Sequence, residues 1–236
     1  EESDKILEII EEGRFIKRID PEVISRNIKR LSTTIRARAA AQKRLHNAGE
    51  YAVPLMLEVL SDPSRKDEYA NVVAAFPKIG RDAIRPLAAA LETKDISVKL
   101  EIIRALGDIG YSQALPYLKY VIENSENDQM IREARIAISK IDPNAMKVTA
   151  AELFFQQGEA YYYHAESLRP RAADIANIWL WDSEAAKLER VAVDNGHFAE
   201  LMSMRCCEWA LKADETTGKA IALWIAAFFK AEAAVD

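Results

Sequence analysis

Apolar side chains recur every three to four residues along most of the chain, which is the spacing that gives a helix one buried face. Between residues 49 and 142 the pattern repeats three times, in steps of 30 and 32 residues. The repeats begin at Ala52, Ala83 and Ala114, and each has a proline near its start, at Pro54, Pro86 and Pro116. Their second helical stretches close with Ile79, Ile109 and Ile141. The pattern therefore predicts three helix pairs in succession.

The ends of the predicted helices carry their own signals. Each repeat-opening proline is expected in the first turn of a helix, where its missing N–H is not needed. Gly80 and Gly110 are expected to end helices in the left-handed conformation. Asp142 stands where the third glycine would be, and Pro143 stops that helix instead.

The second helices of the repeats carry a family likeness. Val98–Gly110 has the sequence VKLEIIRALGDIG, and Ile131–Ile138 has the sequence IREARIAI. With the proline-led helices before them, these segments resemble the short HEAT-type repeat of the phycobilisome-lyase-like class. The resemblance covers residues 49–142 and implies a right-handed α-solenoid.

The same resemblance implies a ladder of ion pairs along the stack. The corresponding pairs would be Asp95 with Lys99 and Asp128 with Arg132. In the first repeat, Glu68–Asn71 lacks the basic residue, so the ladder is not expected to extend there.

Residues 1–48 are expected to cap the exposed end of the solenoid. Residues 3–12 predict one amphipathic helix and Asp20–Glu22 begins another. The pattern of Ile35–Leu45 predicts a third helix, which is expected to run to Gly49. Between Arg14 and Arg44 there are ten basic and two acidic residues, a balance of +8 in a chain of net charge −5.

A basic arm of this kind can attract nucleic acid, an anionic membrane or an acidic protein. Only Phe15 adds an aromatic ring to it, so nucleic acid is the disfavoured partner. A solvated helical surface is the simpler interpretation. The candidate partner-binding residues of the arm are Arg26, Lys29, Arg30 and Arg36.

Composition changes after Pro143. Four tryptophans lie beyond residue 178, and 12 of the 19 aromatic residues lie beyond residue 150. This predicts a separate packing unit over residues 143–236, beginning with a long helix from Pro143 to Glu166. Residues 154–163 and Phe198–Asp214 resemble the two helices of a tetratricopeptide repeat.

A β-hairpin is predicted between these two helices, over residues 178–193. Residues 178–182 alternate in polarity, Ser183–Ala186 suits a turn, and Leu188–Val193 is rich in β-forming residues. Alternate side chains of a strand share a face. Trp179 and Trp181 are therefore expected to pack on the helices, and Leu180 to face the other way.

Three consecutive tyrosines, Tyr161–Tyr163, are about 100° apart on a helix, so at least one should be exposed. Together with nearby basic and aromatic residues they could form a recognition site, since such residues dominate binding energy at interfaces. The alternative is an ordinary core with one exposed tyrosine. The candidate binding residues here are Tyr162, Tyr163, His164, Arg169, Trp179 and Trp181.

Side chains with catalytic or metal-binding chemistry are few. His46, His164 and His197 are far apart and lack paired-ligand spacing, so no metal is expected. Cys206 and Cys207 are adjacent and cannot build a disulfide framework. We expect two packing thiols, no catalytic residue and no cofactor.

Composition supports a folded, mainly all-α protein. Half of the residues are hydrophobic and 29% are charged, whereas only eight are glycine. Glycine-rich nucleotide-binding folds and β-sandwiches are therefore disfavoured. We expect a HEAT-like solenoid followed by a tetratricopeptide-like unit that carries the hairpin, with domains at residues 1–48, 49–142 and 143–236.

The expected function is a non-enzymatic scaffold that binds a protein or peptide; the sequence leaves the oligomeric state open. The alternatives are a bilin-lyase-like chromophore enzyme, which the HEAT-type resemblance implies, and anionic-ligand or nucleic-acid binding through the basic arm. No apolar run approaches the roughly 20 residues that span a bilayer.

The chain begins at Glu1 rather than Met. A soluble cytoplasmic protein and one exported after loss of a signal peptide are both compatible with this start. Residues 230–236 have the pattern of a helix that runs on, so more protein is expected to follow.

Overall fold

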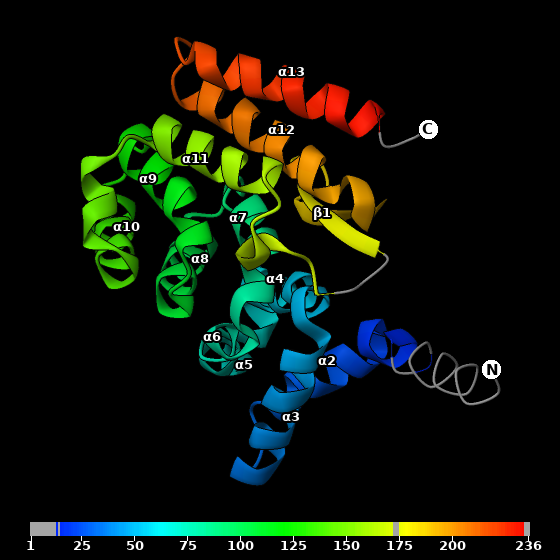
Figure 1. Ribbon diagram of the computed structural model, residues 1–236. Coiled ribbons are helices and arrows are strands. Elements are labelled where there is room, and N and C mark those ends of the chain that lie inside the picture. Colours follow the sequence, from blue (N-terminus) through cyan, green and yellow to red (C-terminus); the bar gives the residue numbers. More distant parts are fainter. Residues whose placement is uncertain (1–12, 14, 172–174, 234–236) are drawn as a thin grey trace, which may run out of the picture. The chain divides into compact units, whose positions relative to one another are not determined.

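The computed structural model describes residues 13, 15–171 and 175–233 (Figure 1). The helix expected over residues 3–12 lies outside these ranges. The described chain is mainly helical and contains one antiparallel two-stranded sheet, which confirms the predicted fold class. The contacts between residues divide the chain into two compact units, with the boundary between Leu87 and Ala88.

The first unit consists of short helices joined by tight turns. Asp20 caps α2, because its carboxylate accepts hydrogen bonds from the backbone N–H groups of Glu22 and Val23. Its α-helices are α2 (Pro21–Arg30), α3 (Ile35–Ala48), α4 (Val53–Ser61), α5 (Lys66–Val73) and α6 (Phe76–Ile79). Helix α7 (Ile84–Ala90) contains the boundary between the units. Three 3₁₀ turns connect the helices: Gly49–Ala52, Pro63–Arg65 and Gly80–Ala83.

The second unit contains longer helices and the sheet. Its helices are α8 (Ile96–Ile109), α9 (Leu115–Asn124), α10 (Asp128–Ile141), α11 (Ala150–Tyr162), α12 (Asn195–Ala213) and α13 (Gly218–Glu232). Its strands are β1 (Ile175–Asp182) and β2 (Lys187–Asp194). Short 3₁₀ turns cover Ser112–Ala114, Pro143–Lys147 and Glu166–Leu168.

The predicted helix ends are largely confirmed. Pro54 and Pro116 lie in the first turns of α4 and α9. Gly110 ends α8 in the left-handed conformation, with φ 78° and ψ 20°. Gly80 has φ 79° but ψ −148°, so the left-handed helix end predicted for it is wrong. The chain there turns directly into the 3₁₀ segment Gly80–Ala83.

Helices α8 and α10 pack at very close range. Gly107 makes this possible, because a Cβ atom at its position would lie 2.6 Å from the Cβ atom of Ala137. Figure 1 shows α8, α9 and α10 as neighbours, and contacts between α10 and each of the other two join them. Small residues here let two helix backbones approach more closely than a larger side chain would allow.

Ion pairs do join α8 to α10, but not between the residues that the resemblance implied. Arg104 Nη2 lies 2.8 Å from a carboxylate oxygen of Glu133. Lys140 Nζ lies 2.6 Å from a carboxylate oxygen of Asp108. Asp95 is instead the N-cap of α8, where it accepts backbone hydrogen bonds.

The prediction of one long helix that begins at Pro143 is wrong for its first residues. Pro143–Lys147 forms a 3₁₀ turn, and α11 begins only at Ala150. Thr149 caps α11 by accepting a hydrogen bond from the N–H group of Glu152. A capping hydroxyl at Thr149 competes with helix continuation, which explains the break.

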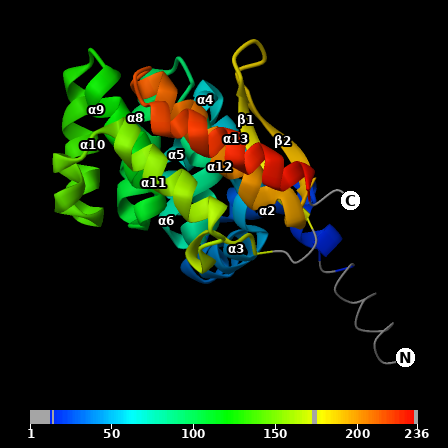
Figure 2. The ribbon, with the colours of Figure 1, turned by 45° about the horizontal axis from the view of Figure 1, so that its top comes forward.

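Helices α11, α12 and α13 lie side by side (Figure 2). Gly158 of α11 allows close contact with α12, and the Ser203 hydroxyl donates a buried hydrogen bond to the carbonyl oxygen of Gly158. The core of this layer consists of Ala150, Phe154, Cys207, Ala210 and Ala220.

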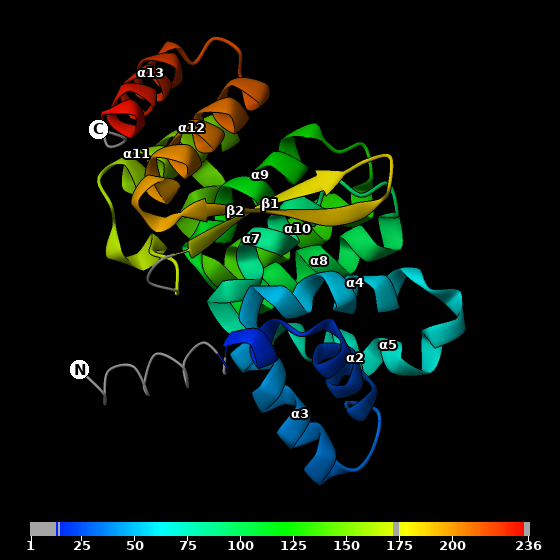
Figure 3. The same cartoon turned by 90° about the vertical axis from the view of Figure 1, so that its right-hand side faces the viewer.

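The predicted hairpin forms, and Figure 3 shows its two strands side by side. The side chains of β1 that pack on α12 are not the expected tryptophans, although Trp179 is itself buried. Ala176, Ile178 and Leu180 pack with α12 residues in one core cluster, whereas Trp179 and Trp181 are on the opposite face. Small and aliphatic side chains let the strand approach α12 more closely than two indole rings would.

Candidate partner-binding groove

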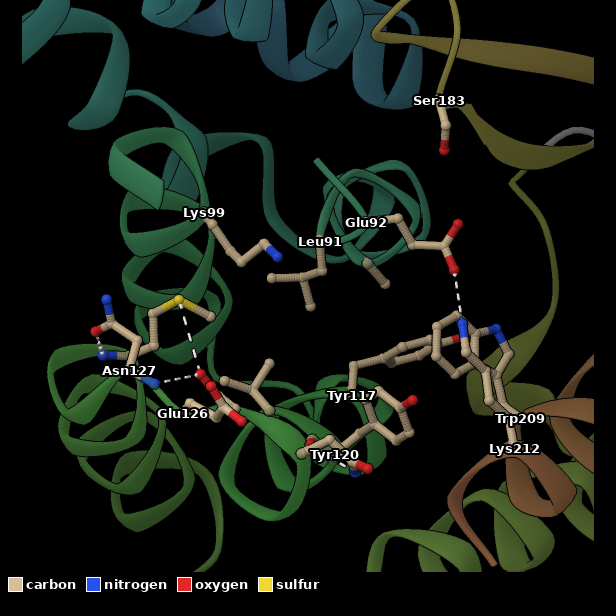
Figure 4. A pocket seen from close by; sticks show the side chains of 15 residues that line it. Leu91, Glu92, Lys99, Tyr117, Tyr120, Glu126, Asn127, Ser183, Trp209 and Lys212 are labelled. Atoms are coloured by element: carbon tan, nitrogen blue, oxygen red, sulfur yellow. Dashed lines mark hydrogen bonds and ion pairs between the residues drawn. The ribbon is translucent and has the colours of Figure 1, made fainter. Parts of the chain in front are cut away.

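The second unit contains a cavity of about 710 Å³ that we call the α9–α12 groove. Figure 4 shows its side chains converging from the end of α7, the first turn of α8, α9, the start of α10, the hairpin turn and α12. It is lined by Ala88, Leu91, Glu92, Lys99, Tyr117, Tyr120, Val121, Asn124, Ser125, Glu126, Asn127, Met130, Ser183, Trp209 and Lys212.

Aromatic rings form one wall of the groove. The Trp209 ring lies 5.2 Å from the ring of Tyr120 and 5.9 Å from that of Tyr117, both edge to face. Behind it, the fully buried Phe154 ring stacks on Trp209 at 5.6 Å. Each such ring pair contributes about 0.5–1.5 kcal/mol beyond its buried area. The wall is therefore held in place from behind and offers half-buried ring faces to a ligand.

Lys212 closes one side of the groove, and its charge is already compensated. Its Nζ atom lies 4.2 Å from the centre of the Trp209 ring and 3.1 Å from a carboxylate oxygen of Glu92 (Figure 4). Both partners of the ion pair are well exposed, so it contributes about 1 kcal/mol at most.

Lys99 lies across Leu91 from that ion pair and points toward the middle of the groove (Figure 4). Its side chain is half-buried, and within the described part of the chain no hydrogen bond or ion pair is formed by its ammonium group. Burial lowers the pKa of Lys99, and the more distant charge of Glu92 opposes this only partly. The groove thus contains a positive charge that has lost hydration without gaining a counter-ion.

The remaining polar residues of the groove are at its rim. Asn127 caps α10 through hydrogen bonds from the N–H groups of Gln129 and Met130. The Ser125 hydroxyl accepts a hydrogen bond from the Asn127 N–H group. Glu126 is exposed beside them. The lining residues include no cysteine and no histidine.

Two of the residues predicted from the sequence meet in a second, smaller cavity. His164 and Arg169 line a space of about 230 Å³, together with Tyr161 and Phe198. Neither Trp179 nor Trp181 is among the described residues that line it. Trp179 is buried and Trp181 is half-buried on β1.

The three consecutive tyrosines divide as expected. Tyr161 is buried, Tyr162 is half-buried and Tyr163 is 74% exposed. The Lys230 ammonium lies 4.6 Å from the centre of the Tyr162 ring and donates a hydrogen bond to the Tyr162 carbonyl oxygen. Tyr162 thus helps to attach α13 to the end of α11.

His164 takes part in the same attachment. Its Nε2 atom lies 2.7 Å from Lys230 Nζ and 2.9 Å from a carboxylate oxygen of Glu200, which is itself 3.1 Å from Lys230 Nζ. Glu200 is buried, and its second carboxylate oxygen has no hydrogen-bond partner in the described structure. The three side chains join the ends of α11 and α13 to α12.

The four candidate residues of the basic arm are in the first unit. Arg26, Lys29 and Arg30 are exposed along one face of α2, and Arg36 is exposed in the first turn of α3. No ion pair of these four side chains occurs among the described residues. These four exposed side chains form a positive surface on the first unit.

Both cysteines are buried and free, in agreement with the packing role expected for them. Burial raises the pKa of Cys207 to about 12 and also raises that of Cys206, so neither is poised as a nucleophile. Across the described ranges, no cluster of three metal-ligating side chains occurs. Within the same ranges, no helix has both the length and the apolar character that crossing a bilayer requires.

Sequence reasoning missed the α9–α12 groove. Part of its signal was present, because Tyr117 with Tyr120 and Trp209 with Lys212 are spaced three residues apart and share helix faces. Nothing in this spacing indicates that the two faces meet, or that Lys99 lies beside them.

Comparison with known proteins identifies one part of the chain. A family model described as HEAT repeats matches residues 53–139. No curated protein matches the sequence.

Proposed function

Since residues 53–139 of this chain are HEAT repeats, we propose that the protein is a non-enzymatic scaffold that binds a segment of a partner protein in the α9–α12 groove. HEAT repeats commonly mediate contacts between proteins, because stacked helix pairs present extended binding surfaces. The observation that carries the proposal is the aromatic wall of Tyr117, Tyr120 and Trp209, fixed from behind by Phe154.

The chemistry of the groove supports binding rather than turnover. Nucleophilic or acid–base catalysis usually requires a nucleophile within hydrogen-bond reach of a base. The groove instead presents ring faces and aliphatic side chains, with the Lys99 ammonium inside it and Glu92, Glu126 and Lys212 at its rim. Aromatic residues in a partly dry pocket are the residue types that dominate binding energy at protein interfaces.

Site-specific crosslinking tests this proposal in the full chain. A photoreactive phenylalanine analogue would replace Tyr120 in the groove, and in a matched variant Tyr111, which is exposed and outside the groove lining. Cells that produce the protein would be irradiated and the crosslinked peptides identified by mass spectrometry. We expect one recurring partner segment at position 120 that is absent at position 111.

Equal crosslinking at both positions, or none at position 120, would contradict the groove as the partner site. Circular dichroism of both variants checks that the fold is retained.

A further inference from the structure

We propose that the segment bound in the α9–α12 groove carries a hydrophobic side chain next to a carboxylate, the first packing on Tyr120 and Trp209 and the second pairing with Lys99. This rests on the proposed function and adds the chemistry by which the partner is recognised.

The carboxylate follows from the state of Lys99. Its ammonium group is half-buried and lacks an ion-pair partner among the described residues, while the aliphatic Leu91 is its neighbour in the groove (Figure 4). A half-buried charge has lost part of its hydration, so a ligand anion at this position would supply an interaction that the free protein lacks. The site is therefore built for an anion that arrives with the ligand.

The remaining charges of the groove limit that anion to a single carboxylate. Lys212 is already paired with Glu92, and Glu126 adds a further negative charge at the rim. A polyanion such as a nucleic-acid strand would be repelled by Glu126 and would find one unpaired cation, Lys99, in the groove lining. A single ligand carboxylate next to Lys99 would form an ion pair with its ammonium group and would leave the Lys212–Glu92 pair intact.

The hydrophobic side chain follows from the walls. Val121 and Met130 are buried and add aliphatic surface to the same lining as the rings of Tyr120 and Trp209. Burial of an apolar ligand side chain against these residues is favourable in proportion to the area removed from water. A space of about 710 Å³ is larger than one side chain fills, which suits a short peptide segment.

The test begins with random twelve-residue peptides displayed on phage and selected on the full chain, with counter-selection on the Tyr120→Ala variant. We expect the selected peptides to share a large hydrophobic residue within two positions of Asp or Glu. A synthetic consensus peptide is then measured by calorimetry against wild-type and variant proteins.

Lys99→Met should weaken binding of the consensus peptide about tenfold, while Lys94→Met, which changes an exposed lysine outside the groove lining, should not alter it. Replacement of the peptide carboxylate by its amide should cause the same loss. The two losses should not add when combined, because each removes the same ion pair.

Two results overturn the inference in different ways. In the first, selected peptides depend on Tyr120 and yet bind the Lys99→Met variant as tightly as the wild-type protein. That result would contradict the proposed pairing of a ligand carboxylate with Lys99, but it would leave the groove as the partner site. If no selected peptide depends on Tyr120, the proposed function falls with the inference. Thermal unfolding of each variant shows that a loss of binding is not a loss of fold.

Discussion

Lys99 shows how one side chain can serve binding at a cost to the free protein. Its half-buried ammonium lies among groove residues whose other cation, Lys212, is paired with Glu92. Burial penalises the charged form, so the pKa of Lys99 is lowered. Natural sites often retain such unfavourable groups because a ligand relieves them.

The titration of Lys99 provides a test at this scale. In ¹³C-lysine-labelled protein, we expect the Lys99 signal to titrate at lower pH than a lysine ammonium in free solution, because burial lowers its pKa. Because the folded pKa is below the unfolded one, the unfolded chain binds more protons between the two values, and stability rises with pH there. Below that window, Lys99→Met should be as stable as wild type or more stable, by less than about 1 kcal/mol.

Lys94→Met, which changes an exposed lysine outside the groove lining, is the matched control for the stability measurement. A Lys99 signal that titrates like a lysine ammonium in free solution would show that the ammonium is fully hydrated. In that case Lys99 would not need a counter-ion from the ligand, and the proposed ligand carboxylate would lose its support.

At the scale of elements, close approach between helices depends on a few small residues. Gly107 and Ala137 bring α8 and α10 together, and Gly158 does the same for α11 and α12. The ion pairs of Arg104 and Lys140 span the α8–α10 contact but are partly or well exposed. Steric fit, rather than charge, therefore sets the distance between these helices.

The substitution Gly107→Ala sets the intrinsic helix preference of alanine against the steric fit between α8 and α10. Alanine favours an isolated helix over glycine by about 1 kcal/mol. Here the added methyl group would lie 2.6 Å from Ala137 Cβ and 2.8 Å from its Cα atom, so the helices must move apart. We expect a net destabilisation of about 1–3 kcal/mol, measured by urea unfolding.

Gly218→Ala is the control, because a methyl group at Gly218 meets nothing within 4 Å. Ala137→Gly added to Gly107→Ala should restore part of the stability, since it removes only one of the two close contacts. An unchanged or raised midpoint for Gly107→Ala would contradict the close packing of α8 on α10.

At the scale of the whole molecule, charge is unevenly distributed. The segment Arg14–Arg44 has a balance of +8, and the rest of the chain therefore carries −13. On α2, Arg26, Lys29 and Arg30 are exposed along one face. A local positive surface on an acidic protein gives weak, salt-sensitive attraction to polyanions rather than tight binding.

Nucleic-acid binding is therefore expected only at low salt. Fluorescence anisotropy with a labelled twenty-nucleotide strand should show weak binding at 20 mM salt that disappears by 150 mM. Joint replacement of Arg26, Lys29 and Arg30 by glutamine should remove even the low-salt signal. A complex that survives 200 mM salt would instead support the alternative of nucleic-acid binding through the arm.

Local sequence determined much of this structure because its signals act between near neighbours. Helix periodicity, prolines in first turns, the helix start at Asp20 and the left-handed end at Gly110 each depend on residues within about four positions. The hairpin was predictable for the same reason. The break before Ala150 was missed because the capping preference of Thr149 competed with a helical pattern.

Only the tertiary structure decided which faces meet. Strand alternation divides β1 into two faces, but only the packing placed Ala176 and Ile178 against α12 and buried Trp179 on the other face. Tyr120 and Trp209 are far apart in sequence and meet because α9 and α12 both pack on α11. The groove, and the unpaired charge of Lys99 within it, arise from packing between distant elements, which periodicity within a single helix cannot encode.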